Sequence, residues 1–217
     1  MVNRRHFILA GALAGSSGYW TAAQAQAAAG KPVILVVGDS LSAEYGLKRG
    51  EGWVPLLEKR LAEQKIAATV INASISGDTT AGGRARLAGL LSQHKPTHVV
   101  LELGGNDALR GLSLAGTEDN LTQMTKAAQA AGAQVLIVGI QVPPNYGSDY
   151  TRRFEALFAK VAGATKAALV PFLLKGVADS PEAAALFQAD RIHPTAAAQA
   201  RMLDNVWPAL RKLLPAK

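Results

Sequence analysis

The chain has 217 residues, of which 49% are hydrophobic and 18% charged. This size and balance fit one globular domain with a substantial core and argue against several independent domains. It has no cysteine, which excludes disulfides, thiol nucleophiles and thiolate metal sites. The formal charge of +7 comes from basic residues scattered among acidic ones, without a basic stripe or a nucleic-acid-binding module. We therefore expect a basic, solvated surface and no nucleic-acid partner.

The first 27 residues have the organisation of an export signal. Arg4 and Arg5 precede an apolar stretch over residues 7–15, and small residues follow it up to Ala27. Because a helix needs roughly 20 residues to cross a bilayer, this stretch predicts a removable leader rather than an anchor. Cleavage after Ala25 and cleavage after Ala27 both fit. The adjacent arginines fit a twin-arginine signal and an ordinary secretory signal equally well.

Removal of that leader leaves residues 28–217 as a single predicted domain. Its formal charge is +5, since the two arginines leave with the leader. We expect no integral membrane segment in the mature protein, a periplasmic or secreted location, and a monomer.

From Lys31 onward, short apolar runs alternate with longer helical patterns. The runs predict strands at residues 33–37, 69–71, 98–103, 134–140 and 168–172. The helical patterns predict helices at residues 53–64, 84–93, 118–131, 150–164 and 195–214, the last of them kinked or divided by Pro208. Such alternation is typical of parallel strands joined by helical crossovers. The sequence therefore predicts an α/β fold: a three-layer α/β/α sandwich around a five-stranded parallel sheet.

Small polar residues follow the first three predicted strands. They are Gly38-Asp39-Ser40, residues 72–78 and Gly104-Gly105-Asn106-Asp107. In open parallel sheets, sites form beyond the carboxyl ends of the strands. We therefore expect these three segments to meet at one edge of the sheet.

Ser40 has two interpretations. Serine is a common N-cap, so Ser40 could satisfy the first amides of a following helix. The same position suits a nucleophile, because helix amides and the positive end of the dipole stabilise negative charge. A serine hydroxyl reacts only when a base removes its proton, and the base needs a partner that holds its tautomer. The choice between a cap and a nucleophile therefore depends on whether the chain offers such a base.

His193 is the best candidate among the four histidines. His6 lies in the leader, His94 suits the C-terminal end of a helix, and His98 is expected to pack in the core or on the surface. Asp190 precedes His193 by three residues, and Pro194 biases His193 away from helical geometry. Such a turn can fold the carboxylate onto Nδ1 and leave Nε2 facing outward, although Asp-x-x-His alone is also common where a helix begins.

Acyl transfer also needs donors aimed at the tetrahedral oxyanion. The backbone amides of Ser40 and Gly77 and the side-chain amide of Asn106 are the candidates. Gly77 taken alone could be a turn glycine, and Asn106 an Asx-turn residue. Their joint placement after consecutive strands favours the oxyanion hole.

Two other sites are disfavoured. No G-x-S-x-G surrounds Ser40, which argues against a nucleophile elbow of the α/β-hydrolase kind. His94 and His98 have helical spacing for a metal site, but Pro96 lies between them and prevents one helical face from presenting both.

With these residues in view, the chain resembles the SGNH (GDSL) hydrolase family. The four blocks are Gly38-Asp39-Ser40-Leu41, Ser76-Gly77-Asp78-Thr79, Gly104-Gly105-Asn106-Asp107 and Asp190-Arg191-Ile192-His193-Pro194. Within the family it is most similar to the periplasmic thioesterase I / lysophospholipase L1 / arylesterase group, through residues 72–79, 102–111 and 144–147.

The resemblance implies a flavodoxin-like sheet and no cofactor. It also implies that Ser40 is the nucleophile, His193 the base and Asp190 its orienting acid, with Ser40, Gly77 and Asn106 as the oxyanion hole. Residues 106–112 would form a mobile substrate-binding loop, in which Ala108, Leu109 and Leu112 give an apolar face for an acyl chain.

Two residues depart from the family pattern. Arg191 stands where relatives often have glycine, and a bulky cation there either alters substrate access or faces the solvent. Glu44 replaces a small residue common in the group, and we expect it to disfavour anionic substrates.

The predicted function is an exported serine esterase that cleaves carboxylic ester and thioester bonds through an acyl-enzyme on Ser40. Lysophospholipids, acyl esters and aryl esters are the expected substrates. A carbohydrate acetylesterase of the same family would use the same residues with a shorter, more polar acyl pocket. A noncatalytic flavodoxin-like binding protein is the alternative from another class, although it would need neither the distant Asp-x-x-His nor the asparagine.

Overall fold

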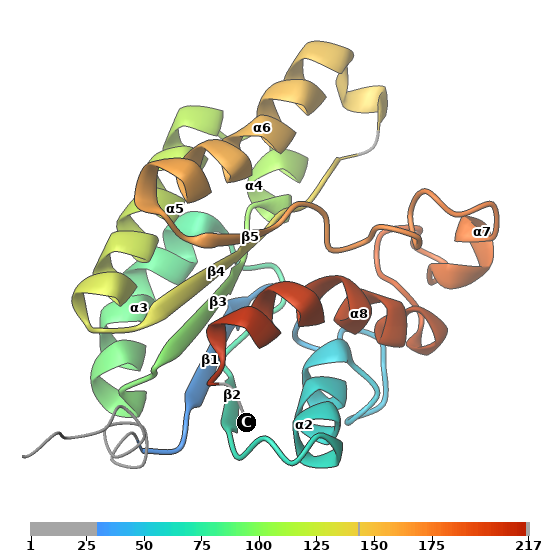
Figure 1. Ribbon diagram of the computed structural model, residues 1–217. Coiled ribbons are helices and arrows are strands. Elements are labelled where there is room, and N and C mark those ends of the chain that lie inside the picture. The colour runs from blue at the N-terminus through green and yellow to red at the C-terminus, as the bar shows by residue number, and fades with distance from the viewer. Residues whose placement is uncertain (1–29, 143, 216–217) are drawn as a thin grey trace, which may run out of the picture. The chain divides into compact units, whose positions relative to one another are not determined.

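The computed structural model describes residues 30–142 and 144–215 (Figure 1). The export signal and its cleavage sites, predicted within residues 1–27, lie outside the described residues. In the part of the chain that is described, no helix is both long enough and apolar enough to cross a bilayer.

An all-parallel, five-stranded sheet forms the middle layer (Figure 1). Its strands are β1 (Val33–Gly38), β2 (Thr69–Asn72), β3 (His98–Glu102), β4 (Gln134–Val138) and β5 (Ala168–Val170). They lie in the order β2-β1-β3-β4-β5, the flavodoxin-like order of doubly wound sheets. The predicted parallel α/β fold is therefore confirmed, with strand ends within two residues of those expected.

Helices cover both faces of the sheet. One layer holds α2 (Trp53–Glu63) and α8 (Ala196–Leu213), which pack against each other. The other layer holds α3 (Thr80–His94), α5 (Leu114–Ala130) and α6 (Ser148–Thr165). The short helices α4 (Gly105–Leu109), η1 (Pro144–Tyr146) and α7 (Ala183–Leu186) were not predicted, because three to five residues are too few to show a helical period.

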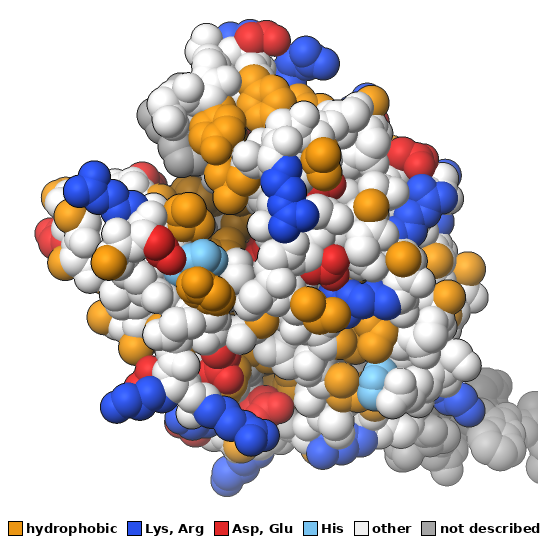
Figure 2. Space-filling view, turned by 180° about the vertical axis from the view of Figure 1, so that it is seen from behind, with side chains coloured by type: hydrophobic (Ala, Val, Ile, Leu, Met, Phe, Trp, Pro, Cys, Tyr) orange, Lys and Arg blue, Asp and Glu red, His pale blue; other side chains and the backbone are white. Residues whose placement is uncertain are grey.

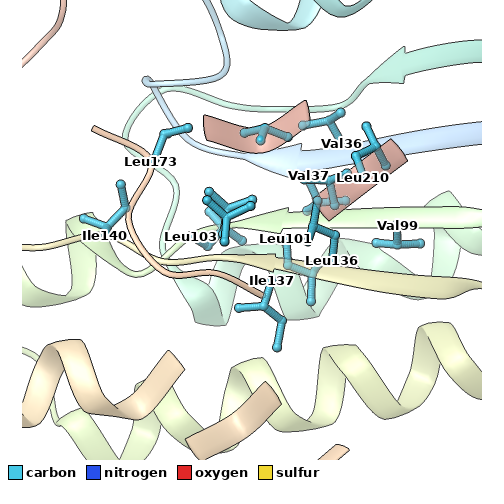
Figure 3. Close-up of a cluster of buried hydrophobic side chains, with 14 of the residues drawn as sticks. Val36, Val37, Val99, Leu101, Leu103, Leu136, Ile137, Ile140, Leu173 and Leu210 are labelled. Atoms are coloured by element: carbon cyan, nitrogen blue, oxygen red, sulfur yellow. The ribbon is translucent and has the colours of Figure 1, made fainter. Parts of the chain in front are cut away.

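The core lies on both sides of the central strands. Residues 34–37 of β1 and 99–101 of β3 have no exposed surface, which explains why these strands read as continuous apolar runs. Figure 3 shows side chains of β1, β3 and β4 in one cluster with Leu210 of α8. Close packing here holds the carboxyl ends of the strands, where the site is built.

Helix α3 begins four residues before the predicted start. Thr79 caps it by accepting a hydrogen bond from the Gly82 amide. The predicted start was late because two glycines, Gly82 and Gly83, weaken the helical signal of the first turn. Gly83 is required there, since a Cβ atom on it would lie 2.4 Å from Leu103 Cδ1.

Helix α8 is continuous through Pro208, so of the two predicted effects, a kink or a division, the division does not occur. Proline has no amide N–H, so the helical hydrogen bond from residue 208 to the carbonyl of Asp204 is missing. Val206 and Leu210 are fully buried on either side of it. Packing against the sheet therefore holds the helix together where its own hydrogen bonding is weakened.

Replacing Pro208 with alanine should stabilise the protein, because the substitution restores the missing amide on an exposed face of α8. We expect the free energy of unfolding to rise by about 1 kcal/mol or more, and the melting temperature by about 2–4 °C per kcal/mol. Thermal unfolding measures this. Lys212→Ala on the same helix is the control, and an unchanged or lower melting temperature for Pro208→Ala would contradict the prediction.

Candidate active site

The loops after β1, β2 and β3 meet at the carboxyl edge of the sheet. Gly38 at the end of β1 pairs with Glu102 at the end of β3, while Val36 pairs with Asn72 at the end of β2. Each strand therefore ends beside its neighbour, and the segments that follow begin within reach of one another. This is the convergence that the sequence predicted.

Ser40, His193 and Asp190 form a continuous chain of hydrogen bonds. Ser40 Oγ lies 2.9 Å from His193 Nε2, and His193 Nδ1 lies 2.7 Å from Asp190 Oδ2. With the proton on Nδ1 donated to Asp190, Nε2 is free to accept the proton of the serine. The three residues thus have the geometry of a nucleophile, a base and an orienting acid.

The Asp190 carboxylate is held by the turn in which it lies. Its Oδ1 accepts hydrogen bonds from the amides of His193 at 3.0 Å and Ile192 at 2.9 Å. These bonds, and then the His193 ring, lower the pKa of Asp190 to about 2. Asp190 is therefore ionised throughout the pH range in which an esterase works.

Ser40 does not begin a helix. The chain turns from Ser40 to Gly46, with Asp39 O accepting from the amides of Ser42 and Ala43, and the next helix begins at Trp53. Both the N-cap interpretation and the expected helix dipole at Ser40 are therefore wrong. An Asx turn replaces them, in which Asp39 Oδ1 accepts from the Leu41 amide at 3.0 Å.

The three predicted oxyanion donors lie on adjoining loops. Among the hydrogen bonds of the described residues, neither the Ser40 amide nor the Gly77 amide has a partner. Asn106 Nδ2 donates to Asp39 Oδ2 at 3.0 Å, which leaves its second N–H available. Arg110 Nη2 donates to Gly77 O at 2.8 Å and ties the Gly77 loop to the segment of Asn106.

Asp107 holds the short helix that carries Asn106. Its carboxylate is buried and accepts from the Thr80 amide at 2.8 Å and from Thr117 Oγ1 at 3.2 Å. The Thr80 hydroxyl also donates to it. One carboxylate thus joins α4 to the first turns of α3 and α5.

Two buried carboxyl groups lie beneath Ser40. Burial raises the pKa of Asp39 to about 6, against the opposing hydrogen bonds from Leu41 and Asn106. Glu102 on β3 has no exposed surface, and burial followed by repulsion from Asp39 holds its pKa well above the usual value. Ser42 Oγ donates to Glu102 Oε2 at 2.7 Å, and Trp53 Nε1 donates to that hydroxyl.

A cavity of about 510 Å³ opens beside Ser40 and His193. Its wall is mostly apolar, and Figure 2 shows hydrophobic side chains in a hollow beside a histidine. The apolar wall comes from Leu41, Leu109, Ile140, Val142, Phe172, Leu174, Ala178, Phe187 and Ile192. Such a wall suits the hydrocarbon part of a substrate.

The predicted substrate-binding residues have three different positions. Leu109 lines the cavity. Ala108 has no exposed surface, because it lies on the inward side of α4, so its assignment to substrate contact is corrected. Leu112 is 43% exposed and is not part of the cavity wall. The segment predicted as a loop over residues 106–112 begins as the helix α4.

The walls contributed by residues 140–142 and 172–187 were missed from the sequence. These segments follow β4 and β5. The rule that sites form beyond the carboxyl ends of strands would have found them if it had been applied to all five strands. Tyr45 was also missed; its ring lies 4.2 Å from that of His193, centroid to centroid. No motif marks that contact.

The other two histidines in the described part of the chain, His94 and His98, have the structural positions expected of them. His94 ends α3, and His98 is buried with its ring nitrogens bonded to Thr97 Oγ1 and Leu213 O. Glu44 does not face the cavity, since its carboxylate accepts from the amides of Gly50 and Gly52, and its expected effect on anionic substrates therefore has no structural basis. Across residues 30–142 and 144–215, no group of three acidic or histidine side chains is placed to hold a metal ion.

Comparison with known proteins gives consistent matches. Residues 36–201 match the GDSL-like lipase/acylhydrolase family. The chain is 54% identical to the esterase TesA of Pseudomonas aeruginosa over 83% of this chain and 89% of the relative. It is 40% identical to thioesterase 1/protease 1/lysophospholipase L1 of Escherichia coli K12 over 86% and 87%. The crystal structure of TesA superposes with a TM-score of 0.81, covering 84% of this chain and 99% of that one.

Replacing Asn106 with alanine should remove one donor to the oxyanion while leaving the Ser40–His193 pair in place. We expect kcat for an aryl ester to fall by roughly 10²–10³ with little change in KM, because the lost interaction forms only in the transition state. Steady-state kinetics measure this. Asn145→Ala, at an exposed asparagine outside the site, is the control. A variant whose kcat stays within threefold of wild type, about 0.65 kcal/mol, would remove Asn106 from the oxyanion hole.

The raised pKa of Asp39 should appear in the stability of the protein. A carboxyl group with a pKa near 3.8 when unfolded and about 6 when folded binds more protons in the folded state between these values. Stability due to this group is therefore present below pH 3.8 and is lost as the pH rises through 6, by up to about 3 kcal/mol.

Urea denaturation at pH 4, 5, 6 and 7 measures this effect. Asp39→Asn should show a smaller fall in the free energy of unfolding between pH 4 and pH 7, keeping only the part due to other groups such as Glu102. Glu63→Gln, at an exposed carboxylate, should keep the fall seen in wild type. The same fall in wild type and in Asp39→Asn would show that Asp39 is not the group responsible.

Proposed function

The chain belongs to the GDSL-like lipase/acylhydrolase family, and from that premise we propose that it hydrolyses acyl esters through an acyl-enzyme on Ser40. The hydrolase class follows from the family. The assignment of the individual residues is carried by one observation, the hydrogen-bonded series from Ser40 Oγ through His193 to Asp190 at the mouth of an apolar cavity.

In the first step Ser40 Oγ attacks the carbonyl carbon of the ester while His193 Nε2 takes its proton. The resulting oxyanion is stabilised by the amides of Ser40 and Gly77 and by Asn106 Nδ2. The intermediate then collapses, and His193 returns the proton to the departing alcohol. Asp190, ionised because its pKa is about 2, stabilises the imidazolium that exists between these two transfers.

In the second step water replaces the alcohol. His193 Nε2 takes a proton from water as its oxygen attacks the acyl carbon, and the same three donors hold the second oxyanion. Collapse breaks the bond to Ser40 Oγ, which recovers its proton from His193. The products are a carboxylic acid and the regenerated enzyme, so the reaction needs only water as co-reactant.

The cavity supports substrates with a hydrocarbon acyl or aryl group. Its wall is built largely of aliphatic and aromatic side chains, which favours lysophospholipids, acyl esters, aryl esters and acyl thioesters over acetylated sugars. Relatives named as esterase, arylesterase and thioesterase/lysophospholipase fit this range. A carbohydrate acetylesterase, the alternative within the family, would have no use for an apolar wall of this extent.

We further propose that the protein is exported and acts as a monomer. The arginine pair and apolar stretch of residues 1–27 support export to the periplasm or beyond. The triad, the oxyanion donors and the cavity wall all come from a single chain, which supports a site that is complete in one copy.

Labelling by a fluorophosphonate tests the serine mechanism directly. The protein should be modified once, at Ser40, and Ser40→Ala should lose both the label and hydrolysis of p-nitrophenyl esters, since the tetrahedral phosphonate forms only on an activated serine. Intact-protein and peptide mass spectrometry locate the label. Ser42→Ala is the matched control, because Ser42 is a neighbouring serine whose buried hydroxyl donates to Glu102 instead. A wild-type protein that takes no label would refute the mechanism.

Chain-length preference separates the two enzymatic alternatives. We expect p-nitrophenyl hexanoate or octanoate to exceed the acetate in kcat/KM, because each buried CH₂ contributes about 0.8 kcal/mol, or roughly fourfold. Initial rates across the ester series measure this. A strict preference for acetate would favour the carbohydrate acetylesterase.

A further inference from the structure

Arg191 has an unusual backbone for a residue with a side chain. Its φ of 59° lies in the left-handed region, where a Cβ atom costs of the order of 1 kcal/mol. This conformation shapes the turn that lets Asp190 reach the amides of Ile192 and His193. Glycine would adopt it without strain. The backbone at this position would accept glycine at lower cost, so the turn itself does not require the arginine side chain.

The other strained positions have local explanations, and Arg191 does not. Lys95 and Lys166 are the C-caps of α3 and α6, and Lys65 follows the C-cap of α2, where left-handed residues are common. The side chain of Glu44 accepts two loop amides. The Arg191 guanidinium, by contrast, has no hydrogen-bond or ion-pair partner among the described residues.

Arg191 contributes to the wall of the catalytic cavity, and so do two aspartates, Asp39 and Asp179. Asp39 is buried, and its carboxylate accepts from the Leu41 amide and from Asn106 Nδ2, so Asp179 is the exposed one. Arg191 and Asp179 both line the cavity that contains Ser40 and His193. Asp179 Oδ1 accepts from the Gly176 amide, which fixes the carboxylate and leaves Oδ2 for another partner. No ion pair between Arg191 and Asp179 is present among the described residues, although both are exposed. Among the described residues that line the cavity, the exposed charged ones are thus Arg191 and Asp179, and they do not form an ion pair with each other.

We propose that Arg191 and Asp179 form a subsite for a zwitterionic phosphodiester headgroup in the leaving alcohol of the substrate. The planar guanidinium binds the phosphodiester oxygens, and the carboxylate binds the ammonium group. The acyl chain then lies along the apolar wall, with the ester carbonyl at Ser40. This assignment rests on the proposed esterase function, and within it makes lysophospholipids with an amino headgroup the preferred substrates.

Three monomeric substrates with the same octanoyl chain test the subsite. They are monoacylglycerol, lysophosphatidylglycerol, which adds the phosphodiester, and lysophosphatidylethanolamine, which adds the ammonium as well. Wild type should favour the last in kcat/KM. Arg191→Gln should lower kcat/KM for both phosphodiesters by about tenfold or more relative to monoacylglycerol, the effect of losing a hydrogen bond to a charged group. Asp179→Asn should lower only the kcat/KM for lysophosphatidylethanolamine relative to that for lysophosphatidylglycerol.

Controls separate recognition from a structural role of the turn. Arg191→Gly removes the backbone strain, so it should unfold at a higher temperature than wild type and still show the same loss of preference as Arg191→Gln. Arg191→Lys should keep part of the preference for phosphodiesters over monoacylglycerol, because the lysine ammonium still acts as a point charge. Lys175→Gln, an exposed cation in the segment of Asp179 that does not line the cavity, should leave all three ratios unchanged.

Two results would overturn the subsite. In the first, the ratio of kcat/KM for the phosphodiesters to kcat/KM for monoacylglycerol stays within twofold of wild type in both Arg191→Gln and Arg191→Gly. The other is an equal loss on all three substrates, which would mean that Arg191 acts only through the Asp190 turn. Wild type would still cleave monoacylglycerol and take the fluorophosphonate label in either case. If wild type does neither, the esterase function itself is wrong, and the subsite falls with it.

Discussion

The parallel pairing of β1 with β2 on one side and β3 on the other is the constraint on which the site depends. Parallel neighbours end at the same edge, so three loops that are tens of residues apart in the chain start next to one another. The hydrogen bond from Asn106 Nδ2 to Asp39 Oδ2 joins residues that are 67 positions apart in the sequence, and it requires this register. A slip of one residue would reverse the faces of a strand and separate Asn106 from Asp39 and Ser40.

The site combines carboxyl groups in opposite environments. Asp190 lies in an exposed turn, where two amides and the histidine ring hold its pKa at about 2. Asp39 and Glu102 lie within the sheet edge, where burial raises the pKa of each, and Glu102 is held well above its usual value. Environments that push carboxyl pKa values apart assign different roles to chemically similar groups. Here the exposed Asp190 is kept charged beside the His193 ring, while the buried carboxyl groups of Asp39 and Glu102 accept hydrogen bonds from the neighbouring loops.

Much of the site was predictable because its signals are local. Asp190 and His193 are three residues apart with a proline after them, and Ser40, Gly77 and Asn106 each follow a recognisable strand. The missed features are those in which the partner is distant in sequence. Examples are the ring of Tyr45 against His193, the tie from Arg110 to Gly77 O and the role of Asp107 in joining α4 to α3 and α5. The error at Ala108 and the continuity of α8 through Pro208 have the same origin, since packing decided both.

The sequence by itself determined the alternation of strands and helices, the edge of the sheet at which polar residues gather, and the residue types needed for acyl transfer. These follow from hydrophobic period, turn residues and short spacings, all of which act over a few neighbouring residues. The tertiary structure alone decided which side chains touch. It set the 2.9 Å contact of Ser40 with His193, buried Ala108, and brought Arg191 and Asp179 to one cavity wall. Such contacts depend on the packing of distant segments, which no local pattern encodes.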